Sequence, residues 1–139
     1  MIVIDEYLAM RVVSARSWPG GLPGTDYLAL PSSRHWRLLQ RIHVPTGGQL
    51  SQRLAAATPA AHDALRFPHP EVLQVLDPRP LVDEAAQLGA RFGGGWLVDE
   101  TLAAGLHHGH ALWFGTERNV GRGLRAAADE LGITVHVVV

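Results

Sequence analysis

Residues 96–139 read WLVDETLAAGLHHGHALWFGTERNVGRGLRAAADELGITVHVVV and decide the fold. A helix is expected over about 99–107, followed by a strand over the apolar run 111–114. Apolar residues at steps of four, four and three predict a last helix, which Gly132 ends. The β-branched run 133–139 then predicts a strand. A strand, a helix and a strand in this order favour parallel pairing of the two strands.

Three acidic side chains are expected at one edge of this sheet. The first helix climbs roughly 12 Å and the strand after it returns roughly 13 Å, so Asp99 and Glu117 share an edge. Asp5 follows the run Ile2-Val3-Ile4, which predicts a short buried strand, so it too lies past a strand's carboxyl end. This edge is where open α/β sheets build sites. Three carboxylates gathered there need a cation to neutralise them, and oxygen ligands suit Mg²⁺ or Mn²⁺.

Length and composition predict one globular domain over 1–139, because 139 residues with 47% hydrophobic and 18% charged residues suffice for one core. The net charge of −1 gives no support to general nucleic-acid binding. Cysteine is absent, which excludes disulfides, thiolate metal sites and cysteine catalysis. No apolar run reaches the length of a membrane span and no basic start resembles a signal peptide, so we expect a cytoplasmic protein.

The middle of the chain predicts helices between the first strand and residues 96–139. One helix is expected from Ser32 or Ser33, as its cap, to about Ile42, with Trp36, Leu39 and Ile42 on its apolar stripe. Another face of this helix carries a row of arginines, Arg34, Arg37 and Arg41. The row is either a solvated face or a contact surface. Further helices are expected over 49–57, after Thr58-Pro59, over 71–76 and over 81–92. The predicted class is a three-layer α/β/α domain with a small central parallel sheet.

Four parts of this pattern together resemble a PIN domain. They are Val3-Ile4-Asp5 at the first strand, Asp99 followed by Leu102-Ala103-Ala104, the strand and polar turn over 112–119, and Glu130-Leu131-Gly132-Ile133 before the last strand. The resemblance covers roughly the last third of the chain and the first strand. Family members are typically Mg²⁺-dependent ribonucleases, and many small bacterial members are the toxin of a type II toxin-antitoxin pair.

Carried over residue by residue, the resemblance places Asp5, Asp99 and Glu117 at three acidic positions of the family and Asn119 at a fourth, more variable one. The chain departs from the family twice. Glu117 stands where the family usually has aspartate. The early glutamate of the family, expected in the helix after the second strand, has no match, because residues 34–42 contain no carboxylate.

The resemblance implies a metal-dependent endoribonuclease toxin that hydrolyses RNA phosphodiester bonds with Mg²⁺, with Mn²⁺ as the alternative metal. In this reading Asp5, Asp99 and Glu117 hold the metal and Asn119 orients the site. The side chains expected to contact RNA phosphates are Arg34, Arg37, Arg118 and Arg122. A cognate antitoxin protein is the expected partner, and a homodimer is a frequent state of such domains.

Each candidate residue also has a structural interpretation. Asp99 and Asn119 are good helix caps, and Glu117 can be an ordinary surface residue. Glu6 and Glu100 are expected to point away from the site. His107, His108 and His110 form a local cluster, for which a helix end is favoured over a zinc site because no partner ligand stands at a standard spacing.

A second function belongs to a different class, a degenerate PIN-like module that has lost catalysis and binds a protein or an RNA. The missing glutamate and the nearly neutral net charge favour this module, whereas Asp5 and Asp99 favour the nuclease.

Overall fold

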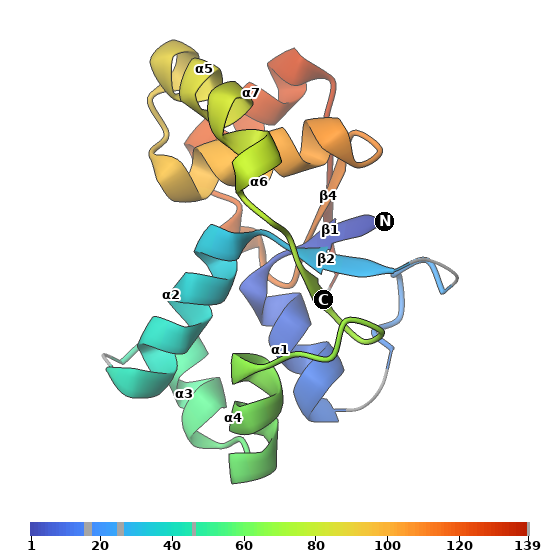
Figure 1. Ribbon diagram of the computed structural model, residues 1–139, viewed down its shortest axis with the longest axis vertical. Helices are drawn as coiled ribbons and strands as arrows, with labels where there is room; N and C mark the ends of the chain where they lie inside the picture. Colours follow the sequence, from blue (N-terminus) through green and yellow to red (C-terminus); the bar gives the residue numbers. More distant parts are fainter. Residues whose placement is uncertain (16–17, 25–26, 46, 139) are drawn as a thin grey trace.

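A computed structural model describes residues 1–15, 18–24, 27–45 and 47–138 (Figure 1). Its strands are β1 (Ile2–Ile4), β2 (Leu28–Leu30), β3 (Gln74–Val75), β4 (Ala111–Phe114) and β5 (Thr134–Val137). Its helices are α1 (Glu6–Ala15), α2 (Ser32–His43), α3 (Gln49–Ala55), α4 (Pro59–Arg66), α5 (Val82–Phe92), α6 (Trp96–His107) and α7 (Arg122–Leu131). Two short 3-10 helices, η1 (Arg79–Leu81) and η2 (Glu117–Asn119), lie before α5 and α7.

The five strands form one parallel sheet in the order β3-β2-β1-β4-β5. Helices α5, α6 and α7 lie on one side of it, and α1 to α4 lie on the other (Figure 1). This arrangement confirms the predicted three-layer α/β/α class. None of the helices in the described ranges has both the length and the apolar character needed to cross a membrane.

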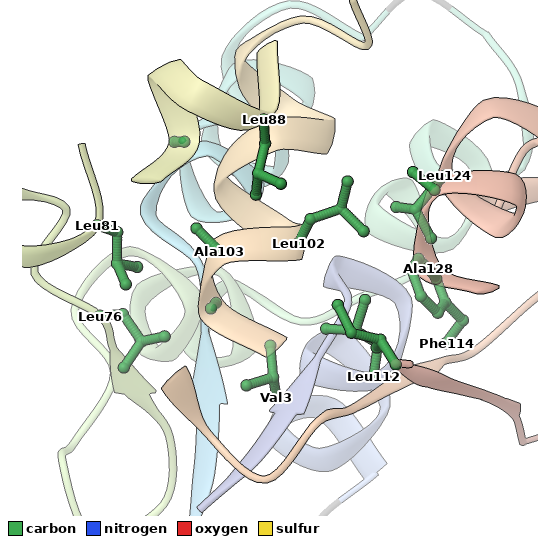
Figure 2. Close-up of a cluster of buried hydrophobic side chains, with 14 of the residues drawn as sticks. Val3, Leu76, Leu81, Leu88, Leu102, Ala103, Leu112, Phe114, Leu124 and Ala128 are labelled. Atoms are coloured by element: carbon green, nitrogen blue, oxygen red, sulfur yellow. The ribbon is translucent and has the colours of Figure 1, made fainter. Parts of the chain in front are cut away.

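Side chains alternate between the two faces of the sheet along β1, and both faces are apolar. Val3 belongs to a cluster with Leu102 and Ala103 of α6, and Figure 2 shows Val3 lying beneath them. Ile2 and Ile4 belong to a second cluster on the side of α1. A strand of three residues buried on both faces reads as a continuous apolar run, which is the pattern that predicted it.

The predicted breaks are confirmed where the backbone requires a special residue. Gly93 and Gly132 end α5 and α7 in the left-handed conformation, with φ of 69° and 71°. Thr58 caps α4, since its Oγ1 accepts a hydrogen bond from the N–H of Ala61 at 3.1 Å. Residue 139, the last of the predicted strand 133–139, lies outside the described residues.

Other predicted boundaries are wrong. Helix α6 begins at Trp96 after Gly95, so Asp99 lies inside its first turn and does not cap it. The cap position of α7 is Gly121 and that of α2 is Pro31, which excludes Asn119 and the serines as caps there. The short helix expected over 71–76 is replaced by β3, because pairing with β2 outweighs local propensity.

Candidate functional site

The candidate site lies where the order of the strands reverses. After β1 the chain crosses to β2 on one side of it, whereas β4 pairs with β1 on the other side. The carboxyl ends of β1 and β4 therefore flank the switch point, the position at which open parallel sheets bind ligands. Asp5 stands at the end of β1, and Gly115 stands at the end of β4.

Asp5 is 1% exposed and accepts three hydrogen bonds. Its Oδ1 accepts from the N–H of Leu8 at 2.9 Å and from the N–H of Gly115 at 3.0 Å, and its Oδ2 accepts from Nδ2 of Asn119 at 2.7 Å. The bond to Leu8 is that of a helix N-cap, so Asp5 stabilises the start of α1.

Gly115 is required for this close approach of β4 to α1. A Cβ atom at Gly115 would lie 2.8 Å from Cβ of Tyr7 and 3.2 Å from the backbone nitrogen of Leu8. Any side chain there would push the end of β4 away from the start of α1, and its N–H would no longer reach Asp5.

Glu6 is fully buried and is neutralised by two arginines of α2. Its Oε2 accepts from Nη1 of Arg34 at 3.0 Å, and its Oε1 accepts from Nη1 of Arg37 at 2.8 Å. Asn119 links the two carboxylates, because its Nδ2 also donates to Oε1 of Glu6 at 3.0 Å while its Oδ1 accepts from Arg37 at 2.9 Å.

Arg34 is 1% exposed and is held from several sides. Its Nε donates to Oγ1 of Thr101 in α6 at 2.8 Å, and its guanidinium carbon lies 5.1 Å from the ring centre of Phe114. The guanidinium thus has a carboxylate, a hydroxyl and an aromatic face as partners, which is what a buried charge requires.

Glu100 joins α6 to the start of α2. Its Oε2 accepts from Oγ of Ser32 at 2.6 Å, and its Oε1 accepts from the N–H of Ser33 at 2.7 Å. A carboxylate from another helix therefore takes the position that a capping side chain would occupy at the N-terminus of α2.

Burial and charge change the pKa values of the two neighbouring carboxyl groups in opposite directions. Burial, reinforced by the negative charge of Glu6, raises the pKa of Asp5 to about 6. Burial also acts to raise the pKa of Glu6, but the charges of Arg34 and Arg37 outweigh it, so this pKa lies below its ordinary value. The negative charge of Glu6 is thus stabilised by two arginines, whereas the surroundings of Asp5 stabilise its negative charge only in part.

Asp99 and Glu117 do not join this cluster. Asp99 is 7% exposed and faces α5, where a Cβ atom on Gly89 would lie 2.7 Å from its Oδ2. Its Oδ1 has no hydrogen-bond partner within the described residues, and burial raises its pKa. Glu117 has a side chain that is 69% exposed and pairs with Arg125.

The predicted metal ligands Asp5, Asp99 and Glu117 are therefore not assembled. Across the ranges that the structure describes, no three Asp, Glu or His side chains are grouped so that they could hold a metal ion. At the histidine cluster, Nε2 of His107 pairs with Glu84 at 2.9 Å.

The predicted site residues fall into two groups. Asp5, Asn119, Arg34 and Arg37 come together, but the two arginines bind Glu6 and Asn119 instead of facing solvent as a row. Arg118 and Arg122 are exposed.

The expectation that Glu6 and Glu100 point away is wrong, because both are fully buried in contacts with α2. One sequence signal could have revealed the buried arginine. Arg34 and Leu38 are four residues apart and form the buried stripe of α2, whereas Trp36 of the predicted stripe is 61% exposed.

Comparisons with protein-family models, with curated proteins and with solved structures find no match for this chain.

Proposed function

We propose that this protein is a catalytically degenerate PIN-like module that acts by binding a protein or an RNA. The observation that carries the proposal is the neutralisation of Glu6 by Arg34 and Arg37. Two guanidinium groups of the chain itself neutralise the carboxylate that adjoins Asp5 at the switch point.

The hydrogen bonds of the cluster support this reading. Both oxygens of Asp5 and both oxygens of Glu6 accept hydrogen bonds from groups within the chain. A metal ion at these oxygens would compete with the hydrogen bonds from Asn119 and the arginines, and a displaced Arg34 would be left as a buried, unpaired charge. A bond between Asp5 and the start of α1 also gives this aspartate a structural role that needs no metal.

A metal-dependent endoribonuclease toxin is the second candidate, and one observation favours it. Burial first, and the charge of Glu6 second, raise the pKa of Asp5, so a bound cation would favour its charged form. In this reading the partners are an RNA substrate and a cognate antitoxin, the protein is cytoplasmic, and it forms a homodimer.

Calorimetry with MgCl₂ and MnCl₂, paired with an RNA cleavage assay, separates the two functions. We expect no saturable metal binding and no metal-dependent cleavage by the wild type. Cleavage that requires metal and is lost in Asp5→Asn, but not in the exposed control Asp129→Asn, would overturn the binding module and establish the nuclease.

A further inference from the structure

A pocket of about 530 Å³ opens between the N-terminal parts of α2 and α6, beside the buried cluster. Its lining residues are Ser32, Ser33, Trp36, Arg37, Trp96 and Leu97. The cluster of Glu6, Asn119 and Arg37 ends at this pocket, because Arg37 belongs to both.

Two tryptophans expose an unusual amount of apolar surface at this pocket. Trp36 is 61% exposed and Trp96 is 47% exposed, although they stand on neighbouring helices that could have buried them. Exposed tryptophans around a hollow are typical of interfaces, where they supply much of the binding energy. The exposed tryptophan surface favours a macromolecular partner over a small molecule.

Polar groups of the pocket remain available for a ligand. Within the described residues Arg37 donates hydrogen bonds only through Nη1, so Nε and Nη2 present a free edge. That edge matches the two oxygens of a carboxylate. Ser33 also lines the pocket and is 6% exposed, and its buried Oγ has no hydrogen-bond partner in the described part of the chain.

Charge selects a carboxylate over a phosphate. Two buried carboxylates contact residues that line the pocket, since Glu6 pairs with Arg37 and Glu100 accepts hydrogen bonds from Ser32 and Ser33, so a dianionic group is repelled more strongly than a single carboxylate. The chain as a whole carries a net charge of −1, which also disfavours a nucleic-acid backbone.

We propose that this pocket docks a protein partner, which inserts an apolar side chain between Trp36 and Trp96 and places an adjacent carboxylate on Arg37. The inference rests on the proposed binding function and names its partner as a protein segment that joins an apolar anchor to an acidic group.

The probes are two capped dipeptides, acetyl-Phe-Asp-amide and acetyl-Phe-Asn-amide, titrated in EDTA while the indole N–H signals are followed by NMR. The Phe-Asp peptide should shift the signals of Trp36 and Trp96 but not that of Trp113, and the Phe-Asn peptide should bind about tenfold more weakly, since it lacks the charge. Trp36→Ala should weaken binding about tenfold. Phe67→Ala, at a residue that is 83% exposed outside the pocket, should leave binding unchanged.

Arg37→Gln should remove the preference for the acidic peptide. If this variant does not fold, the comparison of the Phe-Asp and Phe-Asn peptides on the wild type still tests the carboxylate contact, and Trp36→Ala tests the apolar anchor at an exposed residue. Equal binding of the two peptides, or no shift at millimolar concentration, would overturn the proposal. Shifts caused by oligouridylate but not by either peptide would overturn it in favour of RNA. Because the titrations contain EDTA, metal-dependent cleavage cannot occur in them, so their failure is distinct from the discovery of nuclease activity.

Discussion

At the scale of single residues, Asp5 makes the stability of the protein depend on pH. The raised pKa of about 6, against an ordinary value of 3.8, means that over this interval the folded state holds a proton that the unfolded chain has lost. The stability that Asp5 contributes is therefore fully present below the pKa of the unfolded state, and it is lost as the pH rises through the pKa of the folded state. The folded state therefore favours the protonated form of Asp5 more strongly than the unfolded chain does.

We expect Asp5→Asn to remove this dependence. Between about pH 4 and about pH 7 the free energy of unfolding of the wild type should fall relative to the variant by about 2 kcal/mol, which is most of the effect of a shift of about two pKa units. Urea denaturation of both proteins across this range measures the difference. The free energy of unfolding of the Asp129→Asn control should change with pH as that of the wild type does. A difference between wild type and Asp5→Asn that stays constant with pH would contradict the prediction.

The sequence named four residues that do gather, Asp5, Asn119, Arg34 and Arg37, but it misassigned the carboxylates. The start of α6 lies three residues before the predicted one. Neighbouring residues on a helix differ by about 100° in direction, so Asp99 turns toward α5 and Glu100 toward α2. No local pattern fixes that rotation, because tertiary packing sets it.

At the scale of elements, the contact of α5 with α6 depends on a glycine. Gly89 lies inside α5, where alanine would ordinarily be the better helix former, yet a Cβ atom there would meet Oδ2 of Asp99 at 2.7 Å. Gly123 also lies inside a helix, α7, but a Cβ atom there would have nothing within 4 Å. The two glycines differ in their surroundings and not in their secondary structure.

Gly89→Ala should therefore destabilise the protein by about 1–3 kcal/mol through overpacking, whereas Gly123→Ala should be neutral or stabilising by up to about 1 kcal/mol. Denaturant titration of the two variants gives the comparison. An equal gain for both would show that Asp99 moves aside without cost.

Elements were predictable where local chemistry is decisive. The apolar runs of β1 and β4 and the glycines after α5 and α7 predicted their positions. Strand β3 has only two residues, too few to show a period, and its pairing with β2 comes from the tertiary fold. The parallel class followed from the strand-helix-strand pattern, but the order of the strands could not be derived from it.

At the scale of the whole molecule, the apolar clusters on the two sides of the sheet share elements. Strand β1 contributes to both sides, and α1 carries Leu8 in one cluster and Met10 in a third cluster that includes Leu65 of α4. Loss of either side removes support from the same strand and helix, so the helices of the middle of the chain are not an independent unit. We therefore predict that residues 1–139 unfold as one domain.

Leu65→Ala in α4 and Leu102→Ala in α6 remove fully buried side chains from opposite sides of the sheet, and each should cost about 2–5 kcal/mol. Circular dichroism and tryptophan fluorescence should report one coincident transition in both variants. Val82→Ala, at a residue that is 48% exposed, is the control and should change little. Separate transitions in Leu65→Ala would identify a second domain.

The pair of Glu6 and Arg34 also has an evolutionary consequence. The two residues are far apart in the sequence, yet both are buried and bound to each other. Loss of one alone strands the other as an unpaired charge, whereas joint replacement by apolar residues of similar volume is tolerated in other proteins. Descendants of this chain should therefore keep both residues or lose both together, so that covariation of these positions would mark shared ancestry after the surrounding sequence has diverged.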